Sequence, residues 1–354
     1  MDTTTFRILD TMSRRLGEPL SINELTRGIK KIYGTAHYVN IYDKLHVLAR
    51  QGIADLNRVG RSSVATLNFK NYLLIDLLTE MELRRKQEFL REHGDLQRLF
   101  MELDLYSKDW YLTKSMCLTN PERNIRLNRV ELLILLKEAK EELPTQDEVK
   151  SIYLALQKLQ SVHNLRIDCL TLKMQEFIDF LKLGETNPVA GMMSNKIALI
   201  YPQAFWIEIK EAMDRGFQIK TDEGETKPAM ISQQDLSYNL ARFGYREFGR
   251  EVTQRKRICI EYIVTAVLMR EDARHIQAVP VILAKNEVNY NLLLFLSQKY
   301  GSSQRLLGLL MVLQKFKPMK EIERTIEIMG ILGIEGIGAD EESIMQKMRL
   351  YDVT

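Results

Sequence analysis

The sequence has 354 residues, which is enough for two or three domains with buried cores. An apolar content of 45% and a charged content of 27% are ordinary for globular proteins, and a net charge of +3 is too small to indicate a polyanionic partner for the chain as a whole. The three cysteines, Cys117, Cys169 and Cys259, are far apart, so they indicate neither a disulfide framework nor a paired-cysteine metal site, and they favour a reducing, cytoplasmic compartment.

Three helices are predicted within the first 52 residues. Apolar residues recur at helical spacing from Phe6 to Leu16, and Ser21 with Glu24 matches a capping box that begins a second helix ending at Gly34. A third helix is predicted over residues 35–52. Its expected inward side chains are Tyr38, Ile41, Leu45 and Leu48, and its expected outer side chains are His37, Asn40 and Lys44.

A hairpin with a basic tip is predicted next, because two short alternating runs surround Arg58, Gly60 and Arg61. Three helices followed by such a hairpin is the order of a winged helix-turn-helix, which places its third helix in the major groove and its hairpin on phosphates. Residues 1–70 contain 11 Lys/Arg and 6 Asp/Glu, and this regional charge of +5 suits a phosphate backbone.

The predicted partner of this region is therefore double-stranded DNA. We expect the bases to be read by His37, Asn40 and Lys44, and the phosphates to be contacted by Arg58 and Arg61. Winged helices also serve as protein-contact modules, and Asp43 on the third helix would oppose phosphate. A long helix over residues 71–93 follows, with a charged second half that includes Arg84, Arg85, Lys86 and Arg91. It suits a linker, a dimer contact or a helix packed on the first domain.

Strand and helix signals alternate over residues 104–216, which predicts an α/β domain. "VELLILL" and "NLRIDCLTL" are typical of buried strands, and Thr145 with Glu148 matches a capping box that would start the helix between them. In order and spacing this region resembles the minimal nucleotidyltransferases of the polymerase-beta-like superfamily. Asn128-Arg129-Val130-Glu131 lies on that family's S-D-x-D pattern, and Asp168 in "RIDCL" lies where a third carboxylate stands.

The resemblance implies three carboxylates that hold two Mg²⁺ ions, but the sequence departs from it. Arg129 puts a permanent cation at the first carboxylate position, and the family's Gly-Ser turn is missing. Glu131 and Asp168 are the remaining catalytic candidates, and they could equally pair with nearby arginines. We expect a degenerate domain that needs Mg²⁺ only if it is active. Phosphate could bind without metal to Arg123, Arg126 and Arg129.

The last third is predicted to be helical, broken around Pro280 and Gly301, and it resembles more loosely the helical part of archaeal proteins that join a winged helix to a transferase-like domain. The glycine-rich run at 330–338 lacks the lysine of a phosphate-binding loop, and Asp340 is expected to cap the last helix. No metal-ligand spacing is present. The polar start predicts no signal peptide, and apolar runs of about eight residues are too short to span a membrane.

These patterns together predict an α+β multidomain protein with a winged helix (1–70), a linker helix (71–103), a degenerate nucleotidyltransferase-like domain (104–220) and a helical domain (230–354). The predicted function is DNA binding as a transcriptional regulator, with the central domain as scaffold or ligand sensor. A nucleotide ligand and a homodimer are compatible with this. The alternatives are an active Mg²⁺-dependent nucleotidyltransferase acting on RNA, a small molecule or a partner protein, and a protein-binding adaptor of a toxin–antitoxin-like module.

Overall fold

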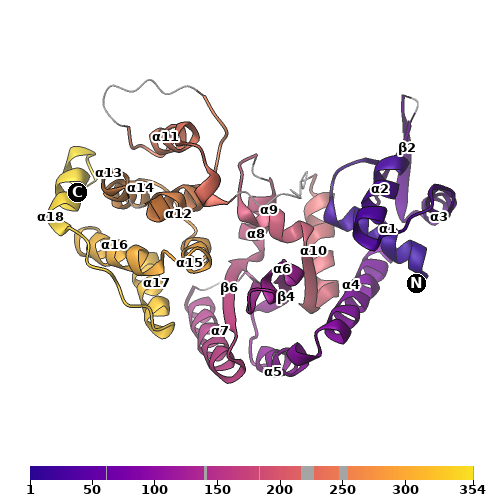
Figure 1. The fold of residues 1–354 in the computed structure, drawn as a ribbon, viewed down its shortest axis with the longest axis horizontal. Helices are drawn as coiled ribbons and strands as arrows, with labels where there is room; N and C mark the ends of the chain where they lie inside the picture. Colours follow the sequence, from indigo (N-terminus) through magenta and orange to yellow (C-terminus); the bar gives the residue numbers. More distant parts are fainter. Residues whose placement is uncertain are drawn as a thin grey trace.

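The computed structural model describes residues 1–60, 62–138, 142–182, 184–216, 227–246, 254–270 and 272–353. They form an α+β architecture with a three-stranded and a four-stranded sheet. Figure 1 shows the N-terminal helices and hairpin at one end of the long axis, the larger sheet in the middle and the C-terminal helices at the other end. None of the described helices is long and apolar enough to cross a membrane.

The second helix begins and ends where the sequence predicts, whereas the third spans Tyr38–Arg50, within the predicted residues 35–52. The N–H of Glu24 donates to Ser21 Oγ at 3.2 Å, and the N–H of Ser21 donates to the Glu24 carboxylate at 2.8 Å, which completes the capping box. Gly34 ends that helix with a φ of 76°, which glycine adopts without strain. The elements of this part are α1 (Thr3–Arg14), β1 (Leu20–Ser21), α2 (Ile22–Tyr33), α3 (Tyr38–Arg50), β2 (Ala54–Val59) and β3 (Ser62–Leu67).

The small sheet has the strand order β1-β3-β2 and is antiparallel throughout. β2 and β3 pair along their whole length, from Ala54 with Leu67 to Val59 with Ser62, so they form the predicted hairpin. The three helices pack on one another around apolar side chains such as Leu9, Leu25 and Leu45, each 0% exposed. The apolar side chains on the inner face of α3 therefore pack into this core, and the outer face of the helix remains exposed.

α4 (Leu73–Glu92) joins this part to the larger sheet, and α5 (Gln97–Ser107) follows after a short 3-10 turn (Gly94–Leu96). α4 packs against α1, and it also packs against β7 (Lys196–Ile200) and α10 (Pro202–Asp214). Its predicted charged half is partly buried, because Arg85 is only 8% exposed.

Buried charged side chains form a network where α4 contacts α1 and β7, and this contact region is called the first junction below. Arg85 Nε lies 3.3 Å from Asp10 Oδ1, and Arg85 Nη1 lies 3.7 Å from Glu82 Oε2. Glu82 also forms an ion pair with Lys196 and accepts a hydrogen bond from the N–H of Ala198 at 3.0 Å. Because a charge removed from water is costly unless it is neutralised, these pairs tie α1, α4 and β7 together.

The larger sheet has the strand order β6-β5-β4-β7. β4 is antiparallel to both β5 and β7, whereas β5 and β6 are parallel in a register that sets Glu131 beside Asp168 and Arg129 beside Arg166. The elements before β7 are β4 (Thr113–Thr119), α6 (Pro121–Ile125), β5 (Arg129–Leu136), α7 (Glu142–His163), β6 (Arg166–Lys173), α8 (Met174–Lys182) and α9 (Pro188–Ser194).

The capping box predicted at Thr145 and Glu148 is wrong, because α7 begins three residues earlier, at Glu142. The Glu148 carboxylate instead accepts hydrogen bonds from the N–H of Leu112, at 2.8 and 2.9 Å, and from the Thr113 hydroxyl at 3.2 Å. It therefore fixes the start of β4 rather than the start of its own helix.

Helices make up the described C-terminal part, as predicted. The expected breaks around Pro280 and Gly301 are present. Gln277 separates a helix that ends at Ile276 from one that begins at Ala278, and Pro280 lies in the first turn of the latter, where its missing N–H costs no hydrogen bond. Gly301, with a φ of 73°, lies between the helices that end at Lys299 and begin at Ser303. The elements are a 3-10 turn (Pro228–Met230), α11 (Gln233–Arg242), α12 (Ile260–Arg270), α13 (Ala273–Ile276), α14 (Ala278–Lys285), α15 (Tyr290–Lys299), α16 (Ser303–Phe316), α17 (Lys320–Ile331) and α18 (Glu341–Leu350).

The glycine-rich segment before α18 is packed on α16. A Cβ on Gly308 would lie 1.9 Å from the carbonyl oxygen of Ile337, and the N–H of Ile337 donates to the Gln304 carbonyl at 3.0 Å. Only glycine at 308 permits this approach. Asp340 caps α18 as predicted, because its side chain accepts a hydrogen bond from the N–H of Ser343 at 3.1 Å.

The buried carboxylate of Asp10 gives a test of the first junction. Burial alone would raise the pKa of Asp10, but the charges of Arg85 and Arg14 and the Tyr33 hydroxyl hold this pKa below its usual value. The stabilisation is therefore present above the unfolded pKa and is lost as the pH falls through the folded pKa.

We expect Asp10→Asn to lower the free energy of unfolding by about 3–5 kcal/mol at neutral pH, because Arg85 loses the nearer of its two buried carboxylate partners. The variant should also lose less stability than the wild type below about pH 4. Urea denaturation across a pH series measures both effects. Asp109→Asn, at an exposed aspartate, is the control. A variant that matches this control at neutral pH would contradict the role of the network.

Candidate nucleic-acid interface and acidic strand ends

The outer face of α3 is exposed at the end of the molecule farthest from the C-terminal helices (Figure 1). His37 precedes the helix as its N-cap residue and is exposed, and Asn40 is exposed in the first turn. Lys44 lies on the same helix, but its Nζ forms an ion pair with Asp2 Oδ2 at 3.0 Å. Of the three residues predicted to read bases, two are therefore open to solvent, and the third is partly neutralised within its own domain.

An aromatic row also lies on α3, and the sequence reading missed it. The Tyr38 and Tyr42 rings stack with centroids 6.2 Å apart, and the Tyr42 and His46 rings lie 4.4 Å apart. Tyr38 is 44% exposed, so the prediction that it packs inward is wrong. Tyr38, Tyr42 and His46 are four residues apart along the helix, and this spacing in the sequence predicts that their rings lie on one face.

The hairpin stands beside α3 in Figure 1 and adds a basic side chain to this end of the molecule. Arg58 is exposed near the end of β2, next to Val59, which is 62% exposed. Gly60 turns the chain with a φ of 60°. Arg61 lies outside the described residues. The exposed face of α3 and the hairpin together are called the α3–hairpin face below.

The second predicted site lies where β5 and β6 begin, and the structure brings its three residues together. Arg129 Nη2 lies 3.2 Å from Glu131 Oε1, and Arg129 also forms an ion pair with Asp168. Glu131 and Asp168 are each 1% exposed. The two carboxylates thus face one guanidinium, as the strand register requires.

Helix α15 closes this site from the C-terminal part of the chain. Lys299 Nζ lies 3.1 Å from Glu131 Oε2, and Arg129 Nη1 donates to the backbone carbonyl of Lys299 at 3.4 Å. Arg166 Nε lies 3.1 Å from Asp168 Oδ1, and its Nη2 donates to the carbonyl of Gln298. The last carbonyls of a helix attract cations, so these arginines also bind the end of α15.

The residues present do not fit a pair of Mg²⁺ ions. Two carboxylates already face three cations, Arg129, Arg166 and Lys299, so a divalent ion would meet net positive charge. Burial raises the pKa of Asp168, and the charges of Arg129 and Arg166 oppose that rise. Among the described residues no group of three or more acidic, histidine or cysteine side chains could hold a metal ion.

The predicted phosphate-binding arginines point to different surroundings. The Arg129 side chain is only 11% exposed and is turned toward Glu131 and Asp168, whereas Arg123 on α6 and Arg126 just after it are exposed. Searches against family models, curated proteins and solved structures found no match to this chain.

We expect Glu131→Ala to lower the free energy of unfolding by about 3–5 kcal/mol, because Arg129 and Lys299 would stay buried with one carboxylate between them. Chemical denaturation measures the change. Limited proteolysis should show earlier cleavage between the central and C-terminal parts. Glu122→Ala removes an exposed acid from α6 and should match the wild type in both assays.

We expect the protein to have the same melting temperature in millimolar Mg²⁺ and in a potassium salt of matched ionic strength. A ligand raises the melting temperature only by binding to the folded state. Thermal melts in Mg²⁺, in Mn²⁺ and in a chelator measure this. A rise with either metal that disappears in Glu131→Ala would mean that the acidic strand ends bind metal after all.

Proposed function

We propose that this protein binds double-stranded DNA through the α3–hairpin face and acts as a transcriptional regulator. In this proposal the N-terminal part is a winged helix: α3 enters the major groove and the β2–β3 hairpin contacts the phosphates. The observation that carries the proposal is the placement of α3, whose inner stripe is used by the core while its outer face lies exposed beside a basic hairpin.

The element order and the strand pairing support this proposal. The order α1-β1-α2-α3-β2-β3, with β1 paired to β3 beside the hairpin, suits a module that presents its third helix. The charge of +5 over residues 1–70 favours a phosphate backbone. Exposed Asn40 can form paired hydrogen bonds with adenine, and exposed Tyr38 and Tyr42 can contact thymine methyl groups or sugars.

The central sheet has a supporting role in this proposal. Its acids are neutralised by Arg129, Arg166 and Lys299, so the arrangement favours a scaffold that holds the C-terminal helices over a transferase. The buried pairs at α4 hold the DNA-binding part against the same sheet.

We expect the double variant Arg58→Ala/Arg61→Ala to weaken binding to a random-sequence duplex and to flatten the plot of log affinity against log salt by about two units. Each phosphate contact contributes about 0.9 to that slope. Fluorescence anisotropy over a salt series measures both quantities.

The matched control is Arg91→Ala/Arg349→Ala, which removes two exposed arginines away from the α3–hairpin face. An unchanged slope in the hairpin variant would overturn the role of the hairpin. Failure of the wild type to bind any duplex at low salt would overturn the proposed function itself.

A further inference from the structure

A cavity of about 620 Å³ lies at the end of the larger sheet opposite to Glu131 and Asp168. Thr113 and Lys114 begin β4 there, Lys137 follows β5 and Tyr201 follows β7. β5 and β7 both run antiparallel to β4, so the carboxyl ends of these two strands lie at this end of the sheet. A volume of this size accommodates a small organic molecule.

Positive charge surrounds this cavity. Lys108, Lys114 and Lys137 come from three different segments, and the described residues that line the cavity include no carboxylate. Lys114 forms an ion pair with Glu208, which lies outside the lining, and Lys137 Nζ donates to the Tyr111 carbonyl at 3.0 Å. Lys108 is exposed. The lining therefore favours an anionic ligand.

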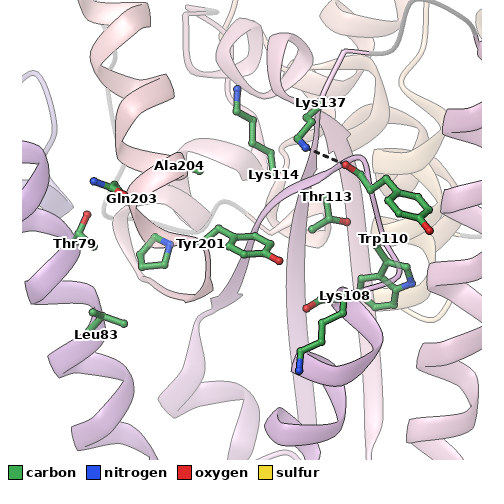
Figure 2. A pocket seen from close by; sticks show the side chains of 13 residues that line it. Thr79, Leu83, Lys108, Trp110, Thr113, Lys114, Lys137, Tyr201, Gln203 and Ala204 are labelled. Carbon is green, nitrogen blue, oxygen red and sulfur yellow. Dashed lines mark hydrogen bonds between the residues drawn. The ribbon is translucent and has the colours of Figure 1, made fainter.

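Aromatic rings complete the lining. Tyr111 is 80% exposed and Tyr201 is 49% exposed, so both side chains are open to solvent as well as lining the cavity. Figure 2 shows the Tyr201 side chain reaching across the cavity, with Lys114 and Lys137 on one side and Lys108 on the other. The first turn of α10, at Gln203 and Ala204, also lines it, and the N–H groups of a first helical turn favour anions.

We propose that this cavity binds a nucleoside phosphate, with the phosphates on the lysines and the first turn of α10 and the base against Tyr111 or Tyr201. Lysine ammonium groups bind phosphate oxygens as point charges, and base–aromatic stacking accepts any base. The site is separate from the acidic strand ends. It also does not depend on the proposed DNA binding, so either proposal can fail alone.

The test is calorimetry without DNA and without Mg²⁺, with each of the four ribonucleoside triphosphates and with inorganic tripolyphosphate. At least one triphosphate should bind more tightly than tripolyphosphate, and its affinity should fall as salt is added. Lys108→Gln/Lys137→Gln should weaken it by about 30-fold, because two charge-assisted contacts are lost. Tyr111→Ala/Tyr201→Asn should bring nucleotide affinity down to that of tripolyphosphate.

Lys158→Gln/Lys320→Gln removes two exposed lysines far from the cavity and should leave the affinity unchanged. Three results would overturn the proposal: no binding of any triphosphate, equal binding of tripolyphosphate by the wild type, or loss of binding in Arg123→Gln/Arg126→Gln instead of the lysine variant. The last result would place the phosphates at the opposite end of the sheet.

Discussion

Charges that are removed from water must be neutralised by their neighbours, and both junctions of this chain are built on that requirement. At the first junction Arg85 lies between Asp10 and Glu82, on the helix that leads into the larger sheet. At the second, Lys299 brings the end of α15 to Glu131. Buried ion pairs add little net stability, but removing one partner is costly. These ion pairs therefore favour one arrangement of the N-terminal helices, the larger sheet and the C-terminal helices over others that would bury the same apolar area.

The same constraint acts where β5 and β6 begin. The register of β5 and β6 places two acids side by side, which is the geometry that metal chemistry needs. Arg129 occupies the space between them, and the helical part supplies a further cation. The cavity lined by lysines and tyrosines lies at the other end of the same sheet. Support and ligand binding can thus lie at opposite ends of one sheet without competing for residues.

Local interactions were predictable from the sequence, and distant ones were not. The capping box at Ser21 and the cap at Asp340 act over three residues, and both form as predicted. Glu131 and Asp168, the two acids singled out in the sequence, lie side by side through the parallel register of β5 and β6. By contrast, Lys299 lies 168 residues from Glu131 along the chain, so no spacing pattern could have indicated their contact. The error at Tyr38 has a related cause, because the packing around a helix end decides which face is buried.

Helix α4 has a mechanical consequence. Its 20 residues form one continuous helix that is roughly 30 Å long. Glu82 and Arg85 fix it to the N-terminal part and the sheet, while Thr79 and Leu83 of the same helix form part of the cavity wall. A displacement of α3 would reach that wall through α1, because α3 packs on α1 and α1 packs on α4. Thermodynamic linkage makes any such communication reciprocal: whatever a cavity ligand does to affinity at α3, a molecule bound at α3 does to the ligand by the same factor.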